Sequence, residues 1–256
     1  MTRSIPEHYV EHPAPPSLRE YVECFWTRGA AAPNARPQHV IPDGCIDLLL
    51  AYAAPTGGQA PEASLAVGTM TRPLVIGAND TLAYVGVRFW PGRAMPFLGV
   101  PAAELTDLRV DIADVWPDRG ASLENLHGRS PSDVLGAFEE LLVGRLSLAR
   151  PLDLTVDAAV RAILRAGGNL SISSLAPALG VTRQHLARAF ALHVGVPPKT
   201  FARVARVRRA LARARVSVTV DWAALALDAG FYDQAHLSGE VRELTGRTPT
   251  EWLASA

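Results

Sequence analysis

The chain has 256 residues, 48% hydrophobic and 20% charged, so it is long enough for two domains and apolar enough to bury a core in each. Two cysteines, Cys24 and Cys45, are too few for a disulfide framework or a four-ligand zinc site. No apolar run reaches the roughly 20 residues that span a bilayer, and residues 1–7 lack the apolar core of a signal peptide, which together predict a cytoplasmic protein without a membrane partner.

The formal net charge of zero hides an uneven distribution along the chain. Residues 1–150 carry 12 Arg and 17 acidic residues, whereas residues 151–256 carry 13 basic residues and 8 acidic ones. Between Ala158 and Val220 there are 11 basic residues and no acid. Such a basic half is expected of a phosphate-binding protein, although a solvated helical face gives the same count. Charge alone therefore leaves nucleic-acid binding and a plain surface equally open.

The first half of the chain has the pattern of β structure. Short apolar runs at Cys45–Tyr52 and Leu82–Trp90 lie between turn formers, and their β-branched and aromatic residues favour strands. Several strands without long helices between them predict a barrel or a sandwich. We also expect short helices near Gly92–Leu98 and Ser122–His127, and a loop at Thr56–Pro61.

A helical pattern replaces the strand pattern at Ser130. The Ser-Pro-Ser-Asp sequence at 130–133 is a helix start, and Arg150-Pro151 ends that helix. A second helix is expected from Thr155 to Ala166, before Gly167-Gly168. The sequence therefore predicts a β-rich sensor or partner domain at residues 1–129, a connecting helix at 130–150 and a helical domain at 151–256.

The C-terminal half contains an internal repeat. Gly180 matches Gly230 at an offset of 50, and Thr182 matches Asp233 at an offset of 51. Each copy predicts a helix-turn-helix motif, with a short apolar helix, a glycine for the tight turn, and a second helix capped by Thr182 or Asp233. One such pattern is a weak sign of DNA recognition, but two in register are a strong one.

The second helix of each copy has polar and basic residues opposite its apolar side, as a helix in the major groove of double-stranded DNA needs. The expected DNA contacts are Thr182, Arg183, Gln184, His185 and Arg188 in the first copy, and Asp233, Gln234, His236, Ser238 and Arg242 in the second. The two histidines either touch phosphate or only complete the motif. Between the copies, Lys199–Arg215 predicts a basic helix of about 25 Å that places the motifs in successive major grooves.

Together these residues resemble the AraC/XylS family of transcription regulators over about Asp157–Leu253. The motifs are Leu175-Ala176, Gly180-Val181-Thr182-Arg183, Gly195-Val196-Pro197-Pro198, Gly230-Phe231, Asp233-Gln234-Ala235-His236-Leu237 and Gly246-Arg247-Thr248-Pro249. The resemblance implies a helical DNA-binding domain with two recognition helices. The family pattern usually has Arg at 239 and Phe at 241, where this chain has Gly239 and Val241, and Glu240 adds a negative charge. We therefore expect the second recognition helix to bind more weakly than the first.

The N-terminal part is similar to a sensor domain found before this module in actinobacterial regulators. The matching stretches include Ile41-Pro42-Asp43-Gly44-Cys45-Ile46-Asp47, Val87-Arg88-Phe89-Trp90-Pro91-Gly92 and Leu98-Gly99-Val100-Pro101. The resemblance implies a cupin-like β-barrel that senses a small-molecule effector or contacts a partner. The expected fold class is α+β with two domains, a mainly-β cupin-like barrel followed by an all-α domain whose two helix-turn-helix motifs are joined by a linker helix.

Asp43 and Arg88 are the candidate effector-binding residues. Pro42-Asp43-Gly44 is first of all a turn, in which Asp43 can also face a ligand. Arg88 lies in an apolar strand, where it either points outward or faces the barrel interior and pairs with Asp43, Asp47 or an anionic effector. Cys45 opens an apolar run and is more typical of a core residue than of a nucleophile.

No pattern in the sequence predicts a cofactor, a metal site or a catalytic residue, and His39 stands alone where a metal site needs several ligands. The prediction is a sequence-specific DNA-binding transcription regulator, not an enzyme, with RNA polymerase as a further partner and a homodimer left open. Two alternatives are a cupin-like enzyme and a methyl-accepting repair protein, each with an attached DNA-binding module. Neither Cys24 nor Cys45 has the basic neighbours that a methyl acceptor needs.

Overall fold

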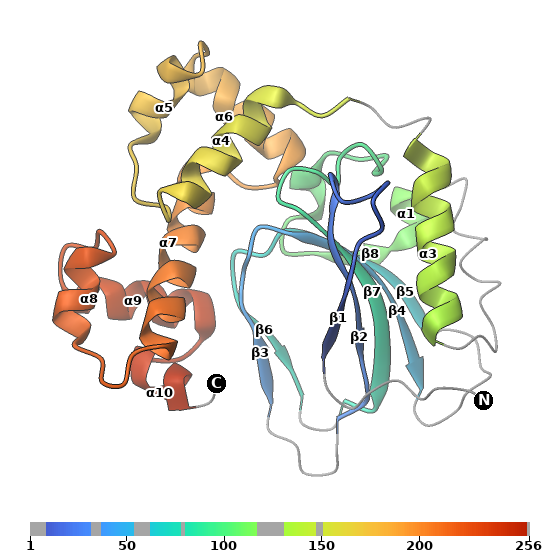
Figure 1. Ribbon diagram of the computed structural model, residues 1–256, viewed down its shortest axis with the longest axis horizontal. Helices are drawn as coiled ribbons and strands as arrows, with labels where there is room; N and C mark the ends of the chain where they lie inside the picture. Colours follow the sequence, from blue (N-terminus) through green and yellow to red (C-terminus); the bar gives the residue numbers. More distant parts are fainter. Residues whose placement is uncertain are drawn as a thin grey trace.

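The computed structural model describes residues 9–31, 37–53, 62–77, 80–116, 131–146 and 151–254. The helix expected at Ser122–His127 and the loop expected at Thr56–Pro61 lie outside these residues. A mainly-β N-terminal part is followed by a helical C-terminal part (Figure 1), which confirms the expected fold class. No helix among the described residues is long and apolar enough to cross a membrane.

The N-terminal part consists of two antiparallel sheets. The larger has the strand order β1-β2-β7-β4-β5-β8, and the smaller pairs β3 with β6. The strands are β1 (Val10–Pro13), β2 (Val22–Arg28), β3 (Gln38–Val40), β4 (Ile46–Ala53), β5 (Ala63–Val67), β6 (Leu74–Ile76), β7 (Leu82–Phe89) and β8 (Arg109–Asp111). Among the described residues no ladder joins the two sheets, so hydrogen bonds between these strands do not close the expected barrel.

The long strands of the larger sheet bury side chains on both faces. Leu48 and Val87 point into the main core, which α3 (Pro131–Leu146) covers with Phe138 (Figure 1). Trp26 and Leu49 belong to a smaller apolar cluster on the opposite face. Because successive residues of a strand point to opposite sides, one face packs the core and the other remains for a site.

The helix expected at Gly92–Leu98 was a wrong prediction. This stretch consists of turns, in which the carbonyl of Ala94 accepts hydrogen bonds from Phe97 at 2.9 Å and Leu98 at 3.2 Å. Gly92 has a φ of +78°, outside the helical region, and Pro96 has no N–H to donate to the preceding turn. Two short helices follow, η1 (Ala102–Leu105) and α1 (Ile112–Val115).

The C-terminal part has two small cores that share one long helix. Its helices are α4 (Leu154–Arg165), α5 (Ile172–Ala178), α6 (Arg183–His193), α7 (Pro198–Arg215), α8 (Trp222–Asp228), α9 (Gln234–Thr245) and α10 (Pro249–Ala254). Phe201 of α7 lies in the first core, with residues of α4, α5 and α6. Leu211 of α7 lies in the second core, with residues of α8 and α9. The predicted linker helix therefore belongs to both helix-turn-helix units.

Candidate functional site

The first helix-turn-helix motif is built as the repeat predicts. Gly180, in the turn after α5, has a φ of +72°, which favours glycine. The Thr182 hydroxyl caps α6 by accepting a hydrogen bond of 3.1 Å from the backbone N–H of His185. Leu186 and Phe190 are fully buried, so their packing turns the opposite side of α6 toward solvent.

The exposed side of α6 carries the expected DNA contacts. Thr182, Arg183, Gln184, His185 and Arg188 are all exposed. Within the described part of the chain, neither Arg183 nor Arg188 is engaged in an ion pair. Their guanidinium groups are therefore available for guanine edges or phosphates.

The second motif repeats this construction on α9. The Asp233 carboxylate accepts a hydrogen bond of 2.7 Å from the backbone N–H of His236. Asp233, Gln234, His236 and Arg242 are exposed, and Ser238 is partly exposed. The expected contact residues of both copies thus lie on solvent-accessible helix surfaces.

His236 has contacts within its own motif. Its Nδ1 accepts a hydrogen bond of 3.2 Å from the backbone N–H of Tyr232. Its ring packs edge-on against Phe231, with 5.4 Å between the ring centroids. These contacts support the interpretation that His236 completes the motif.

Glu240 does not present a free negative charge to DNA. Its carboxylate forms an ion pair with Arg203 of α7, and only 18% of its side chain is exposed. His236 Nε2 lies 3.5 Å from the same carboxylate. The repulsion from phosphate that the sequence suggested is therefore reduced by a cation from the linker helix.

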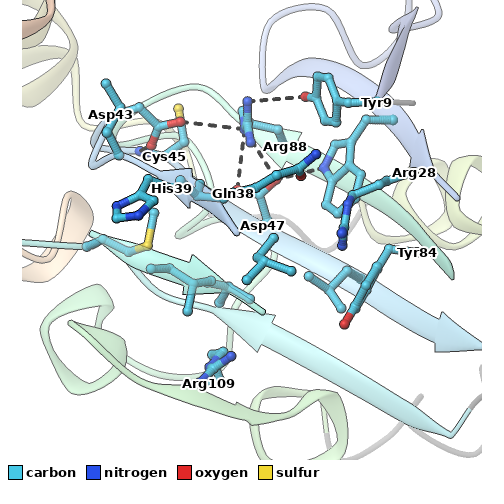
Figure 2. A pocket seen from close by; sticks show the side chains of 18 of the residues that line it. Tyr9, Arg28, Gln38, His39, Asp43, Cys45, Asp47, Tyr84, Arg88 and Arg109 are labelled. Carbon is cyan, nitrogen blue, oxygen red and sulfur yellow. Dashed lines mark hydrogen bonds and ion pairs between the residues drawn. The ribbon is translucent and has the colours of Figure 1, made fainter. Parts of the chain in front are cut away.

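A cavity of about 830 Å³ lies against the face of the larger sheet that carries Trp26 and Leu49, opposite the main core (Figure 2). It is lined by residues from both halves of the chain. The sheets contribute apolar side chains, among them Trp26, Leu49, Leu65, Val67, Leu74 and Ile76. The helical part contributes Arg208 and Arg215 of α7, Arg247, and Trp252 of α10.

Positive charge predominates in this lining. Its arginines are Arg28, Arg88, Arg109, Arg208, Arg215 and Arg247, and its acids are Asp43 and Asp47. Arg28 is neutralised by Asp80 at 2.9 Å. The combination of apolar walls with excess guanidinium groups is suited to a molecule that has an apolar body and an anionic group.

Arg88 faces the cavity from β7 (Figure 2). Its Nε lies 3.2 Å from Oδ1 of Asp47 and 3.7 Å from Oδ2 of Asp43, so of the two alternatives that the sequence left open Arg88 adopts the one with interior ion pairs. The Tyr9 hydroxyl accepts a hydrogen bond of 3.3 Å from Arg88. Burial raises the pKa of Asp47 to about 6, against the opposing effect of Arg88 and of the Trp26 indole N–H. These donors favour the charged carboxylate and so offset part of the effect of burial.

The two cysteines have the environment of core residues. Cys45 is buried and its thiol donates to Glu23 at 3.5 Å. Burial, with the nearby acids Asp43 and Glu23, raises the pKa of Cys45 well above its usual value, and burial raises the pKa of Cys24 to about 12. Because a methyl acceptor reacts as a thiolate, these shifts count against the methyl-accepting alternative.

His39 is engaged by the helical part of the molecule. Its Nδ1 donates a hydrogen bond of 2.9 Å to the carbonyl oxygen of Thr245, at the end of α9. In the described ranges, no group of three or more His, Cys, Asp or Glu side chains is placed to hold a metal ion.

The helical contribution to the cavity is not apparent from the sequence. Arg208 and Arg215 lie in the helix that the sequence predicts as a basic linker between the two motifs, and Arg247 lies in a motif of the DNA-binding module. Nothing in their spacing distinguishes an arginine that faces a cavity from one that faces phosphate. Their position in the cavity depends on how the helices pack on the sheets.

Comparison with known families finds one match in each half of the chain. Residues 10–111 match a family described as Domain of unknown function (DUF6597), and residues 175–255 match a family described as Helix-turn-helix domain. No curated protein matches the chain.

Among solved structures, ToxT from Vibrio cholerae is 11% identical with a TM-score of 0.49, over 90% of this chain and 98% of that one. Wild-type ToxT from Vibrio cholerae strain SCE256 with a bound unsaturated fatty acid is 11% identical with a TM-score of 0.43, over 98% of this chain and 96% of that one. The C-terminal part of the present chain is an AraC-type helix-turn-helix domain, the DNA-binding module of a transcription regulator.

Proposed function

We propose that this regulator reads two successive major grooves with α6 and α9, and that a small anionic molecule in the cavity controls this binding. The observation that carries the proposal is the position of the cavity. The sheet domain provides most of its wall, and α7, the helix that joins the two helix-turn-helix motifs, provides Arg208 and Arg215. A molecule in the cavity therefore contacts the element that spaces the recognition helices.

The length and packing of the linker helix α7 support the proposal that α6 and α9 enter two successive major grooves. It has 18 residues, which correspond to about 27 Å at 1.5 Å per residue. Phe201 is buried in the first helical core and Leu211 in the second, so each motif is packed on α7. Recognition helices held in this way can enter major grooves that lie about 34 Å apart along one side of the DNA.

The charges of the cavity support an anionic effector. Guanidinium groups bind carboxylates, sulfonates and phosphates through paired hydrogen bonds, and they come from both halves of the chain. Trp26, Leu49 and Leu65 provide an apolar wall for the body of the same molecule. We therefore propose an effector with one anionic group and an apolar body, bound between the sheets and α7.

We propose a domain boundary between α3 and α4. Val134, Phe138 and Leu142 of α3 are buried in the main core of the sheet, so this helix belongs with the N-terminal domain as well as connecting it to the next. The DNA-binding domain is then residues 151–256, and this fragment should fold and bind DNA when expressed alone. A fragment that folds but selects no sequence from random DNA would contradict this division. Contacts with RNA polymerase and a homodimer stay predictions.

The test of the proposed function begins with selection of the operator from random DNA by the full chain. Operator affinity is then measured with and without 8-anilinonaphthalene-1-sulfonate, an anion with an aromatic body. We expect the anion to change the affinity of the unaltered protein. Leu65→Trp, which fills the cavity without removing a charge, should abolish this response.

The matched control is Val75→Trp, because Val75 is 52% exposed and does not line the cavity. This variant should respond like the unaltered protein. If the anion binds in the cavity but operator affinity is the same in its presence and absence, control through the cavity is wrong. DNA recognition by α6 and α9 would be unaffected by that result.

A further inference from the structure

We infer that Asp43 substitutes for the anionic group of the effector, holding Arg208 of α7 while the cavity is empty and giving way when the effector binds. The inference rests on the proposed function, because it requires an anionic effector in the cavity. It assigns Arg208, a residue of the DNA-binding domain, to the effector site. It also identifies the contact through which binding reaches the linker helix.

The carboxylate of Asp43 lies between two arginines from different domains (Figure 2 shows Asp43 and Arg88). Its Oδ2 is 3.7 Å from Nε of Arg88 and 3.5 Å from a terminal nitrogen of Arg208. Both separations exceed the roughly 2.7–3.2 Å of an N–H···O hydrogen bond. Asp43 is therefore held near both arginines by charge, without a directional bond that an incoming anion would have to match.

The two arginines depend on Asp43 to different extents. Arg88 also has Asp47 at 3.2 Å and the Tyr9 hydroxyl at 3.3 Å, so it has other partners when Asp43 is withdrawn. Among the described residues, no other carboxylate lies within ion-pair distance of Arg208, and 47% of the Arg208 side chain is exposed. Replacing Asp43 by another anion therefore changes the partner of Arg208 and leaves Arg88 in place.

The turn that carries Asp43 is packed directly on α7. Gly44 has a φ of +84°, and a Cβ atom at this position would lie 2.4 Å from the Phe201 ring. Oδ1 of Asp43 accepts a hydrogen bond of 2.9 Å from the backbone N–H of Cys45. A displaced Asp43 side chain must break or carry along this bond, and the turn that shifts with it lies against Phe201. This contact transmits binding in the cavity to the helix shared by both motifs.

The neighbouring residues of the same segment reach the second helix-turn-helix unit. Ile41 packs against its core, and His39 bonds to the carbonyl of Thr245 at 2.9 Å. Both residues also line the cavity. The segment before Asp43 therefore has one side in the effector site and the other on the DNA-binding domain.

The test uses two probes that differ only in the presence of a sulfonate group. 8-Anilinonaphthalene-1-sulfonate carries a sulfonate, and N-phenyl-1-naphthylamine is the same aromatic body without it. Asp43→Asn keeps an oxygen that can accept from Cys45 but removes the charge. We expect it to bind the sulfonate about 1.5-fold to fivefold more tightly, the range for loss of one competing ion pair, and to bind the neutral probe unchanged.

The decisive measurement combines this change with Arg208→Gln. If the sulfonate takes the place of Asp43 on Arg208, the gain from Asp43→Asn disappears when Arg208 is Gln. Asp47→Asn is the matched control, because Asp47 pairs with Arg88 and not with Arg208. Its effect on sulfonate binding should be the same with either residue at position 208.

The outcomes separate this inference from the proposed function. If Asp43→Asn gains equally with Arg or Gln at 208, Asp43 acts only as a general negative charge and the exchange is overturned, while the cavity remains an effector site. If neither the unaltered chain nor Asp43→Asn binds the sulfonate in the cavity, both proposals fail. Should Asp43→Asn fail to fold, Arg208→Gln and Arg208→Lys decide alone, since only loss of charge at 208 should weaken sulfonate binding.

Discussion

The Thr69 hydroxyl donates a hydrogen bond of 2.5 Å to the backbone carbonyl of Val194, which lies 125 residues later in the chain. Val194 is the C-cap of α6, where the end of a helix leaves carbonyl groups without partners. Thr106 makes the same kind of bond to the carbonyl of Gly195 at 2.7 Å. The first recognition helix is thus anchored at its C-terminus by two hydroxyl groups of the N-terminal domain.

Thr69→Val should destabilise the protein through the buried carbonyl of Val194. Thr69 is 1% exposed, so valine preserves the shape of the side chain but leaves that carbonyl without its donor. An unsatisfied buried group of this kind costs about 1–3 kcal/mol. The free energy of unfolding in urea is the measurement, and Thr250→Val, at an exposed position of α10, is the control. Equal stability of the two variants would show that water replaces the Thr69 bond.

The first recognition helix should carry most of the sequence readout. Arg183 and Arg188 are exposed on α6, whereas the position equivalent to Arg188 on α9 is Gly239. Alanine at Arg183 or Arg188 should cost about 1–3 kcal/mol of operator binding and relax specificity in one half-site. Gln234→Ala should cost less and affect the other half-site. Binding to operators with single base substitutions measures this, and a larger effect of Gln234→Ala would reverse the ranking.

DNA affinity should fall steeply with salt. The 11 basic residues between Ala158 and Val220 are accompanied by no acid. Each phosphate that they neutralise should contribute about 0.9 log units of affinity per log unit of salt. Titration of the operator at several salt concentrations gives the slope. A slope near zero would mean that the basic residues are only solvated surface.

Stability should decrease in mild acid because of His193 in α6. Burial lowers the pKa of this histidine, against the opposing effect of Asp153, whose carboxylate lies 3.7 Å away. The folded protein therefore binds the proton less readily than the unfolded chain, in which a histidine titrates near about 6.5. The stabilisation is complete above that pH and is lost as the pH falls below it.

His193→Gln should accordingly lose less stability than the unaltered protein between about pH 7.5 and pH 5.5. Urea unfolding at the two pH values measures the difference. His185→Gln is the matched control, because His185 is exposed on the same helix. An equal loss in His193→Gln and the unaltered protein would rule out a contribution from His193.

The repeat, its turns and its caps could be predicted from the sequence because they depend on residues close together in the chain. Gly180 permits a left-handed turn, and the hydroxyl of Thr182 reaches a backbone N–H three residues later. The ion pair of Arg88 with Asp47 was one of two alternatives that the sequence left open, since a charge within an apolar strand either points outward or needs a partner. In contrast, the helix expected at Gly92–Leu98 does not form, because Pro96 lacks an N–H donor and Gly92 is left-handed.

The sequence by itself determined the two helix-turn-helix motifs, their exposed faces and the presence of a β-rich N-terminal domain. Only the tertiary structure decided that Arg208 enters a cavity rather than facing DNA, and that Arg203 pairs with Glu240. Local pattern fixes which side of a helix is apolar, because it follows the period of the helix. The partner of a polar side chain, in contrast, depends on how segments far apart in the chain pack together. Here the turn around Asp43 packs on α7 and brings Asp43 to Arg208.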